Sequence, residues 1–362
     1  MRPMSFMGAA ALLLGCAGSR ERGVDDIQAP FLVQRDTSFL LPFEVRTSLA
    51  WSDSGHVALI DGDQKQLVLV GLDGVQRRVG GPGRGPGEFQ LPLQVIGAGR
   101  GELLVFDPFA RSIQWFDRGL RPVRRMTTPH FANGILGELG DTLTLMWQVF
   151  PKDSLGRGVG RISSVGEPLP GSFRLGALDP VFSEVAPLVP DQMVPDPQAL
   201  LRADGLIVLG ESRDYRLWLL AAAGNVLATG GRPELPATEA PVASESDIQK
   251  GIADAQHLTH DPEMLKQVEQ ALRRQSGGPR LKFRHMALDS DRRLWVLGDR
   301  GSLDTTEVDL FDPDLRYLGT IPIPGAVWAI AVEGDRVATL SGTPADEPWI
   351  LSFYTLRAEG MK

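Results

Sequence analysis

Five histidines and a single cysteine are the side chains here that most often bind metals or act as bases and nucleophiles. His257 and His260 are three residues apart and precede Asp261, so one helical face could present both imidazoles to a metal ion. However, Asp261 is followed by proline, a pair typical of the first turn of a helix, which favours a structural role. Because His130 and His285 are isolated in the sequence, we expect no metal site.

A glycine-rich segment at residues 80–87 has the composition of a loop that cradles phosphate. Such loops continue into Gly-Lys-Ser/Thr at the start of a helix, whereas here Phe89 and a strand-like run follow. The segment therefore predicts a tight crossover, with Phe89 packed between neighbouring elements. Asp107 and Asp117 stand at the ends of strand-like runs, and we interpret their carboxylates as acceptors for backbone N–H groups of turns. No catalytic residue and no cofactor are predicted.

Three strand-like runs follow one another between residues 80 and 117, and two hairpin turns separate them. This stretch resembles the NHL repeat, which forms one blade in a group of β-propellers. The residues that match the repeat are Gly85, Gly87, Phe89, Pro92, Gly101, Val105, Asp107, Arg111, Ile113, Phe116 and Asp117. The resemblance covers a single blade, and it implies a propeller fold without implying a reaction.

The same alternation of turns and apolar runs recurs six times along the chain. It predicts an all-β fold, a six-bladed β-propeller of NHL-like type. The last blade lacks an outer strand, because the chain ends soon after its third apolar run. We expect residues 31–34 or 39–41 to supply that strand, so that both ends of the chain share one blade and no open sheet edge remains.

Two long insertions interrupt the repeat on either side of the fourth blade. Residues 166–197 are rich in proline, which cannot donate to a β-ladder, and we expect an irregular surface loop there. Residues 240–280 have a helical periodicity that predicts a short helical insert between blades four and five. Its apolar stripe must pack against something, so we expect the insert to lie across one channel mouth and to border the main pocket. The alternative is that it covers an exposed blade edge.

Propeller enzymes of the lactonase kind resemble this architecture, and that resemblance implies a divalent ion held in the channel by Glu, Asn and Asp ligands. This chain has only Asn133, before an inner strand, and Asn225, in a hairpin turn, which departs from that pattern. The tryptophans are spread almost one per blade, as packing between blades requires. His285, Trp328 and Trp51 fall on or near inner strands and are the candidate channel-lining residues.

The sole cysteine, Cys16, follows a short basic start and an apolar run. The letters LLGC at 13–16 resemble a bacterial lipobox, which implies cleavage before a lipid-modified cysteine. The apolar run is too short for a permanent membrane-spanning helix. We therefore predict a signal peptide at 1–15, a polar tether at 16–29 and a propeller at 30–362, anchored at the cell envelope. An ordinary secretory signal with an incidental cysteine is the alternative.

A formal net charge of −8 and the lack of a basic run give no electrostatic basis for nucleic-acid binding. No acid/base, nucleophile or metal set is evident, so our leading hypothesis is a non-catalytic binding module. It would be a monomer that binds an unknown envelope protein or a small ligand. The alternative is an envelope hydrolase or lyase whose site lies in the central channel, where carboxylates and histidines would have to converge.

Overall fold

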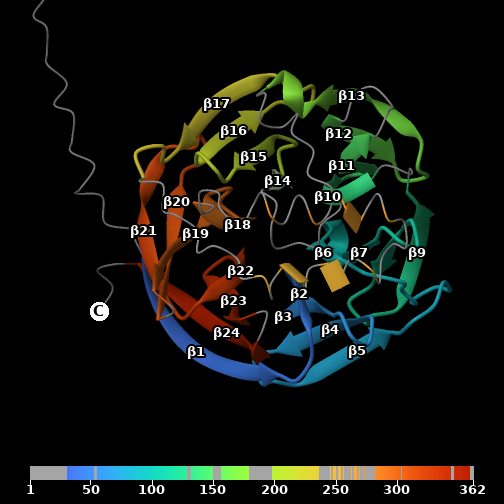
Figure 1. Cartoon of the computed structure of the whole chain (residues 1–362), viewed down its shortest axis with the longest axis horizontal. Coiled ribbons are helices and arrows are strands. Elements are labelled where there is room, and N and C mark those ends of the chain that lie inside the picture. Colours follow the sequence, from blue (N-terminus) through green and yellow to red (C-terminus); the bar gives the residue numbers. More distant parts are fainter. Residues whose placement is uncertain are drawn as a thin grey trace, which may run out of the picture.

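Short runs of alternating apolar residues, separated by glycine and aspartate turns, form β-strands throughout the computed structural model. The model describes residues 31–52, 55–128, 132–149, 156–178, 198–235, isolated positions between 245 and 273, 282–302, 304–343 and 346–358. The strands of these ranges form six four-stranded sheets arranged around a central axis (Figure 1). The predicted six-bladed β-propeller is therefore confirmed.

Each blade is an antiparallel sheet whose four strands follow one another from the centre of the ring to its rim. Blades one and two consist of β2 (Val45–Ser52), β3 (His56–Asp61), β4 (Gln66–Gly71), β5 (Gln76–Gly80), β6 (Gln94–Gly97), β7 (Leu103–Asp107), β8 (Ser112–Phe116) and β9 (Pro122–Thr127). Blades three and four consist of β10 (Ala132–Leu139), β11 (Thr142–Val149), β12 (Gly156–Ser163), β13 (Pro168–Arg174), β14 (Gln198–Leu201), β15 (Ile207–Glu211), β16 (Arg216–Leu220) and β17 (Val226–Gly231). Blades five and six consist of β18 (Phe283–Leu288), β19 (Leu294–Ser302), β20 (Thr305–Phe311), β21 (Tyr317–Pro324), β22 (Val327–Glu333), β23 (Arg336–Thr343), β24 (Asp346–Ala358) and β1 (Phe31–Leu41).

Blade six closes the ring with strands from both ends of the chain. β1 is its outer strand and pairs antiparallel with β24, from Phe31 opposite Ala358 to Leu41 opposite Trp349. The two segments that the sequence offered for this role, 31–34 and 39–41, belong to this one strand. The predicted closure by the N-terminal strand is confirmed, and it leaves no open edge on β24.

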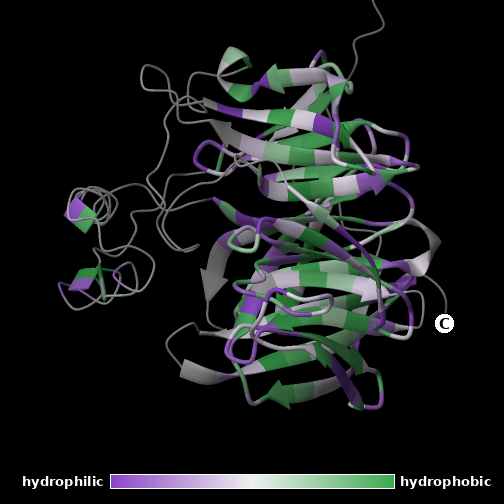
Figure 2. Ribbon diagram, turned by 90° about the vertical axis from the view of Figure 1, so that its right-hand side faces the viewer, coloured by the Kyte–Doolittle hydropathy of each residue, from purple (hydrophilic) through white to green (hydrophobic). Residues whose placement is uncertain are grey.

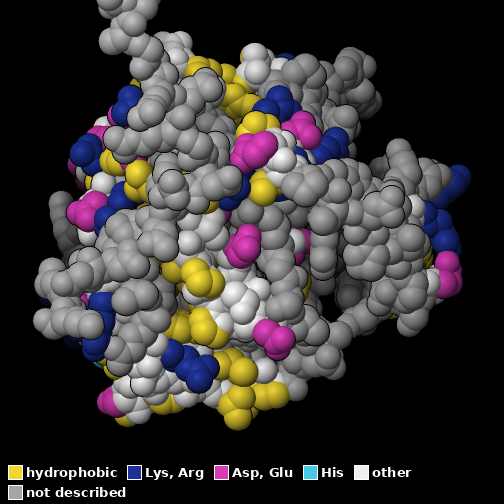
Figure 3. Space-filling view, turned by 90° about the vertical axis from the view of Figure 1, so that its left-hand side faces the viewer, with side chains coloured by type: hydrophobic (Ala, Val, Ile, Leu, Met, Phe, Trp, Pro, Cys, Tyr) yellow, Lys and Arg dark blue, Asp and Glu magenta, His cyan; other side chains and the backbone are white. Residues whose placement is uncertain are grey.

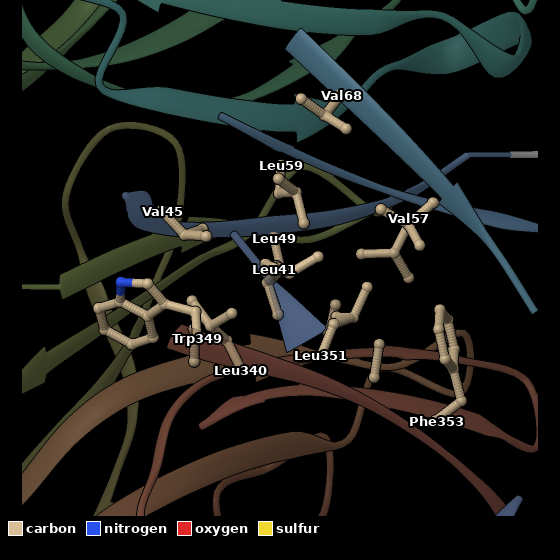
Figure 4. Close-up of a cluster of buried hydrophobic side chains, with 14 of the residues drawn as sticks. Leu41, Val45, Leu49, Val57, Leu59, Val68, Leu340, Trp349, Leu351 and Phe353 are labelled. Atoms are coloured by element: carbon tan, nitrogen blue, oxygen red, sulfur yellow. The ribbon is translucent and has the colours of Figure 1, made fainter. Parts of the chain in front are cut away.

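Six apolar clusters hold neighbouring blades together, one between each pair. In the cluster that joins blades six and one, Leu41 and Val57 lie close to Leu351 and Phe353 (Figure 4). Phe89 is fully buried between blades one and two, as predicted. Burial of apolar area on both sides of every sheet is the main force that keeps the ring together.

The proline-rich segment differs from its prediction in its first part. Residues 168–174 are not an irregular loop but the strand β13, which pairs with β12. Proline is tolerated there because β13 is the rim strand of its blade, and an edge strand leaves the outward N–H positions unpaired anyway. A short 3₁₀ turn, η3 (Leu175–Ala177), follows β13. Residues 179–197 lie outside the described part of the chain.

The helical insert predicted at 240–280 is not supported. Within the described residues the helical elements with defined bounds are two 3₁₀ turns, η3 and η2 (Gly99–Gly101); the isolated positions described between 245 and 273 are helical but form no element with defined bounds. Most of the residues on which the predicted periodicity rests lie outside the described part of the chain. No helix in the described ranges has the length and apolar character needed to cross a membrane.

Candidate functional site

The two faces of the ring carry connections of different lengths (Figure 2). One face, here called the turn face, carries the first-to-second and third-to-fourth strand turns, which contain two to five residues. The opposite face, here called the crossover face, carries the connections between blades. Three of these are long: residues 81–93, 175–197 and 232–282. Long connections on a rigid scaffold are where binding sites concentrate, so the crossover face is the candidate site.

Three buried carboxylates build turns on the crossover face. Asp61, Asp107 and Glu211 each end the second strand of a blade and are at most 3% exposed. Each accepts backbone N–H groups of the following turn at 2.6 to 2.9 Å. The residue four positions later has a positive φ in every case: Lys65 (53°), Arg111 (49°) and Tyr215 (57°). These carboxylates therefore define the shape of the face.

The structural role predicted for Asp107 and Asp117 is confirmed. Asp107 Oδ2 also accepts the backbone N–H groups of Gln90 and Leu91, at 2.5 and 3.1 Å, and so fixes the crossover into blade two. Asp117 Oδ1 accepts two N–H groups of its own turn, at 2.8 and 2.9 Å, on the turn face. These hydrogen bonds, above all the one from the Arg121 backbone, lower the pKa of Asp117.

Polar side chains connect the inner strands to one another near the crossover face. Ser48 Oγ donates to the carbonyl of Val95 at 2.9 Å and accepts from its N–H at 3.0 Å. Gln94 forms the same two-way pair with Ile135, at 2.7 and 2.8 Å. Gln198 donates to a carbonyl of β18 at 2.5 Å. We assign these side chains a structural role, because backbone groups of the neighbouring blade satisfy their hydrogen-bonding capacity.

A cation and an aromatic ring meet where β18 and β22 begin. Arg284 forms an ion pair with Asp299, and its guanidinium carbon lies 4.4 Å from the ring centroid of Trp328. This arrangement is a cation–π contact between blades five and six. Trp328 Nε1 also donates to the carbonyl of Gly342 within blade six.

His285 lies on β18, the inner strand on which the sequence placed it. The residue as a whole is partly exposed, but its Nδ1 is buried and has no hydrogen-bond partner among the described residues. Burial lowers the pKa of His285 to about 4, so the imidazole is neutral at pH 7. Only the exposed part of this neutral ring can meet a ligand, because Nδ1 itself is buried.

Trp51, the third candidate, is 9% exposed and belongs to the cluster between blades six and one. Its Nε1 donates to the carbonyl of Ala331 at 3.1 Å and so links β2 to β22. That Trp51, Trp328 and His285 line the channel stays a prediction.

The metal-binding alternatives find no support within the described ranges. No three His, Cys, Asp or Glu side chains there are grouped so that they could hold an ion. His130, His257 and His260 lie outside the described residues. Asn133 lies on β10, and Asn225 lies in the turn between β16 and β17, so the two asparagines belong to different blades.

A buried polar network that the sequence analysis missed fixes the start of the 232–282 crossover. Asp309 is 0% exposed and accepts from the hydroxyl groups of Tyr215 and Thr320, at 2.5 Å each. Arg232 Nη1 lies 3.3 Å from Asp309 and 2.9 Å from the Tyr317 hydroxyl. The network therefore connects blades four and five where the longest connection begins. A charged residue inside the apolar run 308–311 is the signal that could have revealed it.

Within the long crossover, one ion-pair cluster joins residues far apart in sequence. Arg273 Nη1 and Nη2 each lie 2.8 Å from a carboxylate oxygen of Glu245, and its Nε binds Glu269 at 3.0 Å. The hydrogen bonds from Arg273, followed by that from Gln249, lower the pKa of Glu245 to about 2. Figure 3 shows acidic and basic side chains side by side at the outer end of this segment.

Comparisons with known proteins support the fold. No protein-family model and no curated protein matches this sequence. A member of the DUF4221 family from Bacteroides vulgatus has a TM-score of 0.50 at 10% identity, covering 91% of this chain and 99% of that one. The PQQ-bound aldose sugar dehydrogenase of Streptomyces coelicolor has a TM-score of 0.49 at 14% identity. That match covers 91% of this chain and 99% of the dehydrogenase. Virginiamycin B lyase from Staphylococcus aureus has a TM-score of 0.48 at 12% identity. That match covers 90% of this chain and 100% of the lyase. At 10% identity, the likeness to the first of these structures shows a shared fold alone.

Proposed function

We propose that this chain is a lipid-anchored, NHL-like propeller of the cell envelope that binds an envelope protein or a small ligand through its crossover face, as a monomer. The observation that carries the proposal is the difference between the two faces. The turn face has only turns of two to five residues, whereas the crossover face carries the connections 81–93, 175–197 and 232–282. A fold of this kind is a scaffold, and its function depends on what its loops present.

The turn geometry supports an NHL-like repeat beyond the one blade whose sequence resembles it. In that blade, the matching residues Asp107 and Arg111 are the carboxylate and the positive-φ position of the same turn. The same pair of roles recurs in blade one at Asp61 and Lys65.

Photo-crosslinking in cells tests which face binds. A photoreactive amino acid would replace Gln64 or Asp214, exposed on the crossover face, or Val75 or Asp314, exposed on the turn face. We expect a discrete crosslinked species from the first two positions and none from the second two. Crosslinks of equal yield from the turn face would contradict the proposal.

The lipid anchor is tested by fractionation. We expect Cys16→Ser to move the protein from the membrane to the soluble fraction, because one acyl-bearing residue provides the attachment. Ser19→Ala is the matched control and should stay with the membrane. Retention of the Cys16→Ser protein on the membrane would show that the lipobox interpretation is wrong.

An envelope hydrolase or lyase is the second candidate, and His285 is the observation that favours it. His285 is partly exposed on an inner strand, and the exposed part of its neutral imidazole can orient a substrate or exchange a proton with it. If this alternative holds, His285→Gln abolishes turnover of a panel of esters and lactones while the thermal midpoint stays the same. A wild-type protein without turnover on the panel, or a variant with full turnover, would count against it.

A further inference from the structure

A pocket of about 540 Å³ lies on the crossover face between blades one and two. Three connections form it: the β3–β4 turn, the 81–93 crossover and the β7–β8 turn. Its walls combine positive charge with aromatic surface, and its lining residues are Lys65, Pro82, Gly83, Arg84, Phe89, Gln90 and Phe109.

Among the described residues, no acidic side chain is paired with the positive charges of this pocket. Neither Lys65 nor Arg84 forms an ion pair with any residue of the described ranges. Glu88 is in the same loop, but its carboxylate accepts the N–H of Gly85 at 2.8 Å and does not line the pocket. The smaller pocket on the turn face, about 290 Å³, differs because its Arg124 is paired with Glu138 at 2.7 Å.

Arg84 is positioned by a neutral group, so its orientation is fixed while its charge stays available. With its amide oriented to satisfy both neighbours, Gln90 accepts from Arg84 Nε at 2.8 Å and donates to the carbonyl of Phe109 at 3.0 Å. The backbone N–H of Gln90 is in turn bound to the buried Asp107. A guanidinium that is already held in place loses less conformational entropy when an anion binds.

The apolar part of the pocket is also held by the fold. Phe89 is fully buried and packs on Phe116, with ring centroids 5.9 Å apart. Phe109, at the tip of its turn, is 52% exposed. The 81–93 crossover is held against blade two, because Gln114 accepts from the Gly87 N–H and donates to the Glu88 carbonyl, both at 2.8 Å. An exposed aromatic ring beside two unpaired cations matches a ligand that is both flat and anionic.

We propose that this pocket binds a small aromatic carboxylate, with its carboxylate between Lys65 and Arg84 and its ring against Phe109. Lysine and arginine donate charge-assisted hydrogen bonds to carboxylates, and the arginine fork matches both oxygens. The glycines of the 81–93 crossover shape this pocket without being the anion-binding groups. This site is independent of the protein partner proposed above, and purified protein with a defined probe is enough to test it.

Isothermal titration with 2-naphthoate tests the site, and 2-naphthalenemethanol serves as its uncharged counterpart. We expect naphthoate to bind roughly tenfold more tightly than the alcohol, because a hydrogen bond to a charged group contributes about this factor to the affinity. Arg84→Gln should remove most of this tenfold difference between the two probes. Phe109→Ala should weaken the binding of both probes. Raising the salt concentration should weaken naphthoate alone.

Arg121→Gln is the matched control, because it removes an exposed cation on the turn face. It should leave the affinity for naphthoate unchanged, and thermal melting should show that both arginine variants are folded. Equal affinity for naphthoate and the alcohol, equal losses in Arg84→Gln and Arg121→Gln, or no binding of naphthoate at millimolar concentration would each overturn the proposal.

Discussion

Replacing Asp309 with asparagine tests whether the buried network at the start of the 232–282 crossover holds blades four and five together. Asp309 is the buried counter-ion of Arg232, whose side chain is only 16% exposed, and it accepts two hydroxyl hydrogen bonds at 2.5 Å. Asparagine keeps the shape but has one acceptor oxygen and no charge. Removing one partner of a buried ion pair typically costs about 3–5 kcal/mol. Because Glu234 also binds Arg232, at 2.9 Å, we expect a loss of about 2–4 kcal/mol in unfolding free energy.

The assay is urea unfolding followed by tryptophan fluorescence, in which a loss of stability lowers the midpoint at an unchanged slope. Asp312→Asn is the matched control: this carboxylate caps a turn with two backbone hydrogen bonds, at 2.9 and 2.8 Å, and we expect a loss of about 1 kcal/mol. The double variant with Arg232→Met should lose less than the sum of the single variants, because each single change leaves its partner unpaired. Equal losses for Asp309→Asn and Asp312→Asn, or strict additivity, would refute the reasoning.

Three further predictions concern pH, backbone strain and ring closure. Burial lowers the pKa of His285 from 6.5 to about 4, so the unfolded chain takes up the proton at a higher pH than the folded protein does. The free energy of unfolding therefore falls as the pH decreases from 6.5 to 4. When the urea midpoint is measured against pH, His285→Gln should flatten the curve in this range. Gly231→Ala should lower the melting temperature by several degrees, since φ is 130° and a Cβ would lie 2.0 Å from the carbonyl of Tyr215. Deleting residues 31–41 exposes the edge of β24 and should produce oligomers, which sedimentation would detect; a stable monomer would contradict this.

The ring is predictable from the sequence because the information that specifies it is local. The buried Phe89 and the turn-forming Asp107 stand in fixed places relative to the strands of their own blade, so their roles follow from a few neighbouring residues. β13 is not predictable in the same way, because its prolines argue against a strand until its position at the rim is known. Whether a strand is central or at an edge depends on the whole blade.

The pocket on the crossover face cannot be found from spacing in the sequence. Lys65, Arg84 and Phe109 belong to three different connections, and only the packing of blade one against blade two brings them together. The network of Asp309 is hidden for the same reason, since Arg232 lies on the other side of the longest connection. His285 was placed on the correct strand, but which of its atoms is buried depends on neighbouring blades.

If the proposed lipid anchor at Cys16 is correct, the shared sixth blade also decides which face of the ring is tethered towards the membrane. Phe31 and Ala358 are paired, and this end of β24 lies at the turn face, so both described ends of the chain leave the ring there (Figures 1 and 2). A lipid on Cys16 would therefore hold the turn face towards the bilayer. Strands of seven or eight residues such as β22 and β2, at about 3.3 Å per residue, then raise the crossover face about 25 Å further from the headgroups. The long connections and the cationic pocket would open into the aqueous compartment, within reach of soluble ligands and of proteins projecting from the same or the facing membrane.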